Sequence, residues 1–409
     1  MQLRIVLIQF WRDLKAQRLR TALTLFGLAW GTFCVVLLLA FGEGVSREML
    51  VSMTALGERN IIIWGSRTSM PFEGLARGRR IALEDSDADA ILRLVPAVVR
   101  ASPEYSDHAV LKGPKGEPSA GIAAVRPCFG PMRMIEPSSG GRFLNDRDEA
   151  ERRRVVFLGD QVRQDLFSDE QAVGRTIEIR GIQFLVIGTL PKKPQDSSYS
   201  GRDDNKIFIP ASVAVASFGQ RWPDNMVVEI EKGADAKEAL KEIRAVLGKV
   251  HHFDPADEEA LMTWDVGEMV QMFHTLFLGF RMFLGILGVL TLAVAGIGVS
   301  NIMSMVVEDR TSQIGISMAI GARKRWILSQ ILLETLLVVG LGGTIGVLLA
   351  LGVVKASGLI TLPEGFGTPV FSWQTAVVTA GLLSLIGIVS GMGPARRAAG
   401  LNPAVALRS

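Results

Sequence analysis

Few residues in this chain have the type and spacing needed for chemistry. No G-x-x-x-x-G-K-[ST] phosphate-binding loop is present, since the only Gly-Lys pair, Gly248–Lys249, lacks the upstream glycine. No GxGxxG follows a predicted strand, and no HExxH, CxxC or GxSxG motif occurs. The sequence therefore predicts no catalytic residue and no cofactor-binding residue, and it disfavours an enzyme.

One segment rich in histidine and acidic residues is the candidate metal site. It contains His251, His252, Asp254, Asp257 and Glu258. Adjacent histidines on an irregular bend rarely converge on one ion, so a solvated bend is favoured over a metal site. No metal ligand is predicted.

Glu334 is an acidic residue inside an apolar run. It would lie about 12 Å from Trp326 along a helix, and ionisable groups at such depth normally pair or line a polar interior. Three interpretations are open: a proton or substrate path, a structural partner for a neighbouring helix, or a carboxylate that reaches back to the inner interface. The last two are favoured together, and unchanged activity of Glu334→Gln would exclude the proton path.

The elements that position these residues require a membrane. Hydrophobic residues make up 48% of the chain and 43 further residues are glycine, whereas soluble domains contain about 45–50% of both classes together. The net charge of +3 excludes a nucleic-acid-binding protein with one dominant basic face. Cys34 and Cys128 lie in an apolar and a polar segment, so a disulfide scaffold is excluded.

Four uncharged stretches are long enough to cross a bilayer, which takes about 20 residues. They are Thr21 to Gly42, Met282 to Val307, Thr335 to Val354, and Gly365 to Ala395. We expect transmembrane helices at 21–42, 282–307, 326–354 and 372–394. The first stretch is longer than the hydrophobic part of a signal peptide, about 7–15 residues, so it is interpreted as an uncleaved anchor.

Basic residues set the orientation of these spans. Lysine and arginine concentrate in 1–20, 308–325 and 395–409, but the loop 355–371 carries only one. By the positive-inside rule, both termini are cytoplasmic and 43–281 lies outside a cell (inner) membrane. The segment 1–20 is predicted to be an amphipathic helix on the inner leaflet, because Leu3, Leu7, Phe10 and Leu14 share one face.

Three spans carry a GxxxG pair, a spacing that lets two helices approach closely. The pairs are Gly27 and Gly31, Gly342 and Gly346, and Gly387 and Gly391. We expect helix packing at these glycines and favour it over a specific homodimer face.

The long segment between the first two spans alternates strand-like and helical patterns. Strands are expected at Ile61–Trp64, Val155–Leu158 and Thr176–Ile179, for example, and a helix at 85–95. The pattern predicts an α+β domain with an all-β insert at about 120–205. Apolar stripes at its two ends, within 43–56 and 266–280, suggest that the adjoining spans continue outward as stalk helices.

Several motifs resemble those of MacB/FtsX-type ABC transporter permeases. The segment Asn301–Lys324, followed by Glu334, resembles the signature of that family. The segments Arg20–Gly27 and Gly391–Arg408 resemble its first-span entry and its C-terminal end. Outside the membrane, the matching stretches look like the MacB-type periplasmic core domain: Gly141–Phe143, Val155–Gly159, Val173–Ile177, Phe184–Gly188 and Ile207–Pro210.

The resemblance implies four transmembrane helices with a large α+β extracytoplasmic domain between helices 1 and 2. It implies a dimer of permeases, identical or related, and ABC ATPase subunits that hold the ATP and Mg²⁺. In such families the ATPase moves the outer domain through the stalk helices, a mechanism called mechanotransmission. Because only about 20 residues precede the first span, we expect the ATPase on a separate polypeptide.

The loop 308–325 matches the coupling region of the family and is expected to dock on the ATPase. Apolar residues would supply contact area and charged residues a rim that fixes orientation. The expected coupling residues are Glu308, Asp309, Arg310, Ile314, Gly315, Ile316, Gly321, Ala322 and Arg323. Gln313 and Ser317 depart from the family's usual Glu and Arg. Charge reversal at Asp309 and Arg310 is expected to abolish coupling but not membrane insertion.

The leading interpretation is a permease that exports an amphiphilic or peptidic substrate. A periplasmic adaptor and an outer-membrane channel are candidate partners, and nucleic acid is not. Two alternatives remain open at this point: a signalling permease that activates a cell-wall hydrolase, and a lipoprotein-releasing permease.

Overall fold

The computed structural model describes residues 18–54, 56–168, 170–193, 195, 199–359 and 368–402. Most of the expected N-terminal amphipathic helix, part of the loop 355–371 and the end of the tail lie outside these residues. The chain divides into two compact units. We call Met1–Glu48 with Thr275–Ser409 the helical unit, and Met49–His274 the sheet unit.

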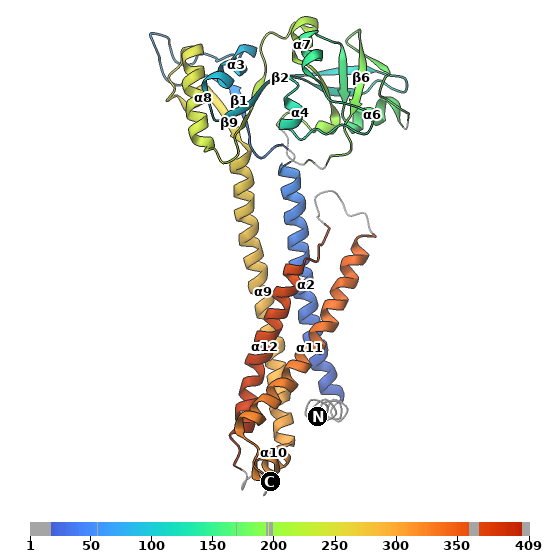
Figure 1. Ribbon diagram of the computed structural model, residues 1–409, viewed down its shortest axis with the longest axis vertical. Coiled ribbons are helices and arrows are strands. Elements are labelled where there is room, and N and C mark those ends of the chain that lie inside the picture. Colours follow the sequence, from blue (N-terminus) through green and yellow to red (C-terminus); the bar gives the residue numbers. More distant parts are fainter. Residues whose placement is uncertain are drawn as a thin grey trace. The chain divides into compact units, whose positions relative to one another are not determined.

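Within the described residues, four helices are long and apolar enough to cross a membrane (Figure 1). They are α2 (Arg18–Thr54), α9 (Val266–Asp309), α11 (Lys324–Ser357) and α12 (Trp373–Ala399). Each overlaps one of the spans expected from the sequence, and α2 and α9 extend well beyond theirs. The expected loop 308–325 contains a further helix, α10 (Thr311–Ala319).

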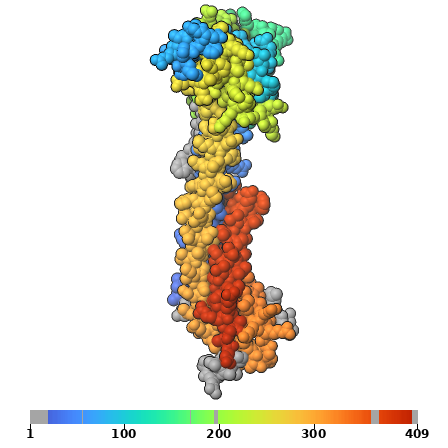
Figure 2. All heavy atoms as spheres, turned by 90° about the vertical axis from the view of Figure 1, so that its left-hand side faces the viewer, coloured from blue at the N-terminus to red at the C-terminus, as the bar shows by residue number. Residues whose placement is uncertain are grey.

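The helical unit is packed through small residues. Figure 2 shows α9 and α12 side by side, and a methyl group placed at Gly296 of α9 would lie 2.8 Å from the side chain of Ile386. Ser372 caps α12 by accepting a hydrogen bond from the backbone N–H of Thr375 at 3.2 Å. Glycine at a helix contact allows the backbones to approach where any side chain would hold them apart.

Nine strands of the described chain form one sheet in the order β3-β7-β4-β6-β5-β2-β8-β1-β9, with a further pairing of β3 to β2. Their bounds are β1 Asn60–Gly65, β2 Val98–Lys112, β3 Ser119–Val125, β4 Val155–Leu158, β5 Thr176–Ile179, β6 Ile182–Thr189, β7 Lys206–Pro210, β8 Asn225–Ile230 and β9 Leu261–Asp265.

The long strand β2 belongs to both parts of this sheet. Its first half pairs with β8, with Ala101 opposite Val228. Its second half pairs with β3 and, at Leu111 and Lys112, with β5. The extra β3 pairing closes a ring through β2, β3, β7, β4, β6 and β5, and leaves β8, β1 and β9 as an open arm. Ring and arm therefore share a strand.

Shorter helices cover the sheet (Figure 1). They are α3 (Asp85–Leu94), α4 (Phe129–Met132), α5 (Asp146–Ala150), α6 (Asp160–Phe167), η1 (Asp203–Asn205), α7 (Ala211–Phe218), α8 (Ala236–His251) and η2 (Glu258–Ala260). Helices α3 and α8 bury Ile91 and Ile243 in the same hydrophobic cluster as Ile61 of the arm. The ring has its own core around Leu158, Phe184 and Ile209.

A third cluster of the sheet unit receives the ends of two long helices. Met53 at the end of α2 and Val266 and Val270 at the start of α9 are buried together with Phe157 and Phe208 of the ring. Both helix ends are therefore part of the hydrophobic core of this unit.

The expected all-β insert at 120–205 is corrected by the structure. Helices α4, α5 and α6 lie within it, and its strands belong to the common sheet. These helices are of four to eight residues, too short to produce a helical hydrophobic period. The start of α5 does carry a local signal, a capping box in which Asn145 accepts from the backbone N–H of Asp148 at 2.9 Å.

The histidine-rich bend is also more ordered than expected. Asp257 is buried and accepts hydrogen bonds from the backbone N–H and the hydroxyl of Ser69, at 2.7 and 2.8 Å. His251 contacts Asp87 at 2.8 Å, and His252 contacts Glu73 at 3.1 Å. In the part of the chain that the structure describes, no group of three His, Cys, Asp or Glu side chains is arranged for a metal ion.

Candidate functional site

The expected coupling residues gather on and around α10, between α9 and α11. Ile314 and Gly315 are buried, and Ile314 joins a hydrophobic cluster of the helical unit with Val307 and Ile331. The charged side chains of Glu308, Asp309 and Arg323 are exposed. Gly321 has a φ of 104°, a conformation that favours glycine, and Ala322 packs against the same cluster as Ile314.

Two apolar side chains of this segment face outward. Ile316 is 46% exposed and Ile320 is 82% exposed. They lie close in sequence to the exposed Arg323, Lys324 and Arg325. Exposed apolar side chains with a charged rim are typical of a surface that another protein covers.

Arg310 and Glu334 form a buried ion pair. The Arg310 Nη1 atom lies 3.2 Å from each carboxylate oxygen of Glu334, and the Gln330 amide donates to Glu334 Oε1 at 3.3 Å. The side chains are 13% and 4% exposed. Of the three interpretations of Glu334, the geometry matches the structural partner, because the carboxylate joins α11 to the residue that precedes α10.

The glycine pair of α11 packs on α2. A methyl group at Gly342 would lie 2.7 Å from Cβ of Leu28, and one at Gly346 would lie 2.4 Å from the carbonyl oxygen of Ala29. The pair of α12 packs on α11 in the same way. At Gly387 the methyl would lie 2.9 Å from Leu336. At Gly391 it would lie 2.8 Å from the hydroxyl of Thr335.

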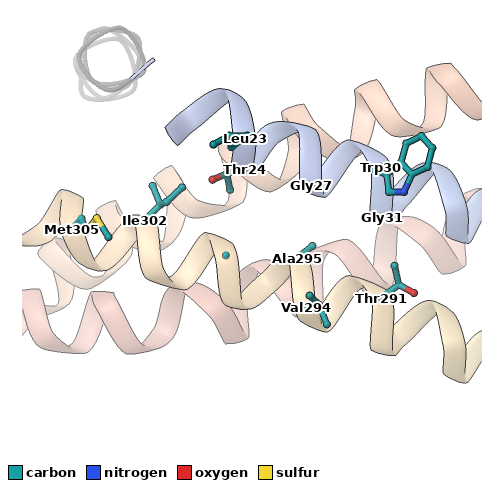
Figure 3. A pocket seen from close by; sticks show the side chains of 11 residues that line it. Leu23, Thr24, Gly27, Trp30, Gly31, Thr291, Val294, Ala295, Ile302 and Met305 are labelled. Carbon is teal, nitrogen blue, oxygen red and sulfur yellow. The ribbon is translucent and has the colours of Figure 1, made fainter. Parts of the chain in front are cut away.

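The glycine pair of α2 differs. A methyl group placed at Gly31 would make an ordinary contact with Leu292, at 3.6 Å, but at Gly27 it would have no neighbour within 4 Å among the described residues outside its own helix. Helix packing within this chain, expected at Gly27, is therefore not found there. Instead, both glycines line a groove of ≈ 730 Å³ between α2 and α9 (Figure 3). Its other walls are Leu23, Thr24, Trp30, Thr291, Val294, Ala295, Gly298, Ile302 and Met305.

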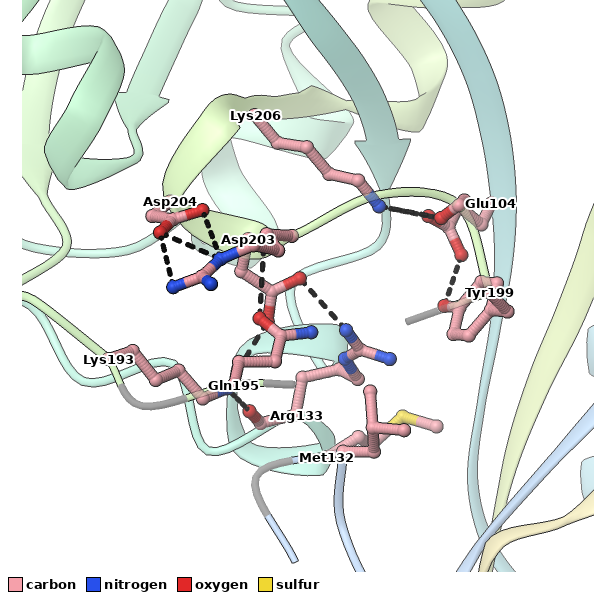
Figure 4. A network of polar contacts seen from close by, with 12 residues as sticks. Glu104, Met132, Arg133, Lys193, Gln195, Tyr199, Asp203, Asp204 and Lys206 are labelled. Atoms are coloured by element: carbon pink, nitrogen blue, oxygen red, sulfur yellow. Dashed lines mark hydrogen bonds and ion pairs between the residues drawn. The ribbon is translucent and has the colours of Figure 1, made fainter. Parts of the chain in front are cut away.

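The sheet unit contains a buried ionic cluster that the sequence did not reveal (Figure 4). Arg133 contacts Asp203 at 2.8 Å, and Lys193 contacts the other Asp203 oxygen at 3.2 Å. Beside them, Lys206 lies 3.8 Å from Glu104, which accepts a hydrogen bond from the Tyr199 hydroxyl. The segment 193–206 supplies four of these residues, and Glu104 and Arg133 come from distant parts of the chain, so no local motif indicates the cluster.

Burial and neighbouring charges shift the pKa values in this cluster. Burial raises the pKa of Tyr199 well above its usual range, and the adjacent Glu104 raises it further. Burial acts in the same direction on Asp203, but the combined field of Arg133, Lys193 and Lys206 outweighs it and lowers the pKa of that carboxyl. Asp203 is therefore held as a carboxylate between cations.

The cluster lies beside the joint between α2 and the sheet. The Asn60 amide donates to the carbonyl of Leu56, just beyond α2, at 2.7 Å, and to the carbonyl of Met132 at 2.6 Å. Met132 precedes Arg133 in the chain. The cluster thus stabilises the segment on which the end of α2 is anchored.

Comparison with known families identifies both units. The family described as "MacB-like periplasmic core domain" matches residues 21–246, and the family described as "FtsX-like permease C-terminal" matches residues 285–403. The chain belongs to the MacB/FtsX-type ABC transporter permeases. It is a multi-pass membrane protein of this family, as the resemblance of its motifs implied.

The relatives of this MacB/FtsX-type permease include longer proteins. It is 34% identical over 407 residues to the macrolide export ATP-binding/permease protein MacB of Wolinella succinogenes, covering 98% of this chain and 60% of the relative. It is 33% identical over 403 residues to the pyoverdine export ATP-binding/permease protein PvdT of Pseudomonas aeruginosa, covering 98% and 58%. The chain thus spans about 60% of the length of these relatives.

Among solved structures, the periplasmic region of MacB from Actinobacillus actinomycetemcomitans is similar to this MacB/FtsX-type permease. The sequence identity is 18% and the TM-score is 0.43, over 54% of this chain and 95% of the other.

Proposed function

We propose that this chain is the permease subunit of an ABC exporter that works by mechanotransmission. A separate ABC ATPase subunit docks on the segment 308–325, which lies on the cytoplasmic side together with both termini. Hydrolysis of ATP on that subunit moves the outer domain, here the sheet unit, and drives export of an amphiphilic or peptidic substrate from the inner membrane. A second permease copy, an adaptor and an outer-membrane channel complete the assembly.

The observation that carries the proposal is the surface of α10 and the turn after it. Ile314 anchors this segment to the helical unit, whereas Ile316 and Ile320 are left exposed beside charged residues. Basic residues alone would satisfy the positive-inside rule, and a topology signal needs no exposed isoleucine. The names of the relatives, ATP-binding/permease proteins, support an ATPase as the occupant of this surface.

The packing of α2 and α9 supports movement of the outer domain. Helix α2 is continuous from Arg18 to Thr54. In the helical unit, its backbone packs closely against Gly342 and Gly346 of α11. Its end at Met53 is buried in the sheet unit. A continuous helix held at both ends transmits a displacement, which a flexible linker would absorb.

Co-purification in nanodiscs tests the docking surface. The chain is co-expressed with a candidate ABC ATPase subunit, and ATP hydrolysis is recorded for the wild type, Ile316→Asp and Ile320→Asp. We expect both variants to insert normally but to lose the ATPase, because a carboxylate would be buried at the contact. The matched control is Val250→Asp on α8, which is as exposed as Ile316, at 46%. Retention of the ATPase by both isoleucine variants would contradict the proposal.

Asp309 is a better charge-reversal site than Arg310 for this test. Reversal of Arg310 would change the charge of the docking surface and would also break the buried pair with Glu334. Asp309→Lys changes an exposed residue of the rim. We expect it to weaken ATPase binding in a salt-dependent manner.

A further inference from the structure

We propose that Glu334 is a positioning residue that clamps the start of α10 to α11 through Arg310. A displacement of α10 is thereby passed to α11 and from α11 to α2. This inference rests on the proposed function, because it assigns the step that follows docking of the ATPase.

The clamp acts at the junction of two helices. Arg310 lies between the last residue of α9, Asp309, and the first residue of α10, Thr311. Its carbonyl oxygen accepts a hydrogen bond from the backbone N–H of Ile314 at 2.9 Å, so its backbone is part of the first turn of α10. Any shift of that turn moves the guanidinium, and the guanidinium is held by Glu334.

Burial makes this contact stiff. Glu334 accepts hydrogen bonds from Arg310 on both oxygens and a further one from Gln330. Separating the pair would leave a carboxylate without its partner inside the helical unit, where water cannot replace the lost contacts. Ile314 and Ile331, one turn before Glu334, are buried in the same hydrophobic cluster, which adds a second attachment between the same helices.

Helix α11 is in turn packed closely against α12 and α2. Thr335, the next residue, is fully buried against Gly391 of α12. Farther along α11, Gly342 and Gly346 bring its backbone against Leu28 and Ala29 of α2. Contacts at this distance transmit motion in both directions, because closely packed surfaces cannot be compressed.

The same geometry argues against a proton or substrate path through Glu334. A guanidinium does not release its proton under physiological conditions, and it occupies both carboxylate oxygens. The side chain is 4% exposed and is not among the residues that line the groove between α2 and α9.

A distance measurement tests the clamp without any partner. In a chain with Cys34→Ala and Cys128→Ala, spin labels are attached at Gln313→Cys and Ser329→Cys, two exposed positions on α10 and α11. We expect one narrow distance for the parent chain and a broadened distribution for Glu334→Gln. An unchanged distribution in Glu334→Gln would overturn the proposal.

Matched variants separate the clamp from general damage. Glu43→Gln removes a carboxylate from the half-exposed pair with Arg281 in the same unit and should leave the distance narrow. Arg310→Gln combined with Glu334→Gln should broaden the distribution no more than either change alone, because the second change removes an interaction already lost. Additive broadening would overturn the proposal. If Glu334→Gln does not fold, Glu334→Asp replaces it, with intermediate broadening expected.

A second experiment adds a candidate ABC ATPase subunit and places a fluorophore at Val51→Cys near the end of α2. ATP should change the fluorescence of the parent chain. In Glu334→Gln the ATPase should still co-purify but the ATP-dependent change should be lost. Persistence of that change would overturn the clamp. Failure of the ATPase to bind the parent chain would instead contradict the proposed function, and the distance measurement would still decide the clamp.

Discussion

The two units of this protein use buried ion pairs in different surroundings. In the helical unit, Arg310 and Glu334 form a buried pair assisted by Gln330. In the sheet unit, Asp203 is shared by Arg133 and Lys193, and a second group built on Glu104 lies beside it. The pair joins the start of α10 to α11, whereas the cluster holds several segments of the sheet unit together.

This difference suggests that the buried charges of the two units have different roles. The cluster gives the sheet unit a rigid base at the point where α2 joins it. The pair of Arg310 and Glu334 lies between the start of α10 and α11, where the proposed clamp would pass on a movement. Buried charges add little net stability when compared with apolar residues, so their value here is in fixing geometry.

The largest expected effect is in the cluster. Asp203→Asn would leave Arg133 buried without its countercharge, so we expect the sheet unit to lose about 3–5 kcal/mol of its free energy of unfolding. Urea unfolding of the full chain, followed by tryptophan fluorescence, measures this loss, because Trp64 and Trp264 pack on Tyr199 beside the cluster. A loss similar to that of an exposed pair would remove the contrast between the units.

Acid should weaken the cluster in a defined window. The pKa of Asp203 is lowered from its ordinary value of 3.8 in the folded protein. Its contribution to stability is therefore complete above about pH 4 and is lost as the pH falls through the lowered folded pKa. Urea unfolding of the wild type between pH 5 and 2, compared with Asp203→Asn, measures it. We expect the variant to lack this part of the acid dependence, and parallel curves would contradict the assignment.

The glycines of the helical unit provide a second contrast. Gly342→Leu places a large side chain against Leu28 and should destabilise the unit by about 1–3 kcal/mol. The matched change Gly27→Leu adds a side chain at the groove, where a Cβ has no neighbour within 4 Å among the described residues, and it should leave thermal unfolding of the isolated chain almost unchanged. Equal destabilisation by the two variants would show that the groove is already filled by this chain.

The smallest effect is expected at a half-exposed pair. Arg281 contacts Glu43 at 2.9 Å, and both side chains are accessible to solvent. Removing the pair by Glu43→Gln should cost about 0–1 kcal/mol, because water replaces the contact. Thermal unfolding of Glu43→Gln and of Glu334→Gln measures how much more stability is lost when the removed carboxylate is buried. A larger loss of stability in Glu43→Gln than in Glu334→Gln would contradict this prediction.

Part of this fold could be predicted from local sequence. The apolar runs Val155–Leu158 and Thr176–Ile179 coincide with β4 and β5, because turn residues limit both. Strand β2 lacks such a local signal over most of its length. Pro103 and the polar residues 104–108 lie in its middle, and its length follows from neighbours on both sides. Strand β9 was missed, and ring closure depends on long-range pairing that no local pattern shows.

The candidate site, too, could be predicted from the sequence only in part. Arg310 and Glu334 were both singled out from the sequence, but for different reasons. Their pairing depends on α10, whose turn brings Arg310 back to α11 across 24 positions of the chain. The buried Arg133 carried no signal, since an arginine in a turn-rich segment is ordinarily exposed.

Photo-crosslinking at Ile320 tests the central claim most directly. A photoreactive amino acid is placed at Ile320, or at the control position Val377 on α12, which is also exposed in this chain, and intact membranes are irradiated. We predict a covalent product with an ABC ATPase subunit from Ile320 and none from Val377. If Ile320 gives no such product while the ATPase is present in the same membranes, the surface of α10 is not where ATP hydrolysis is coupled to this chain.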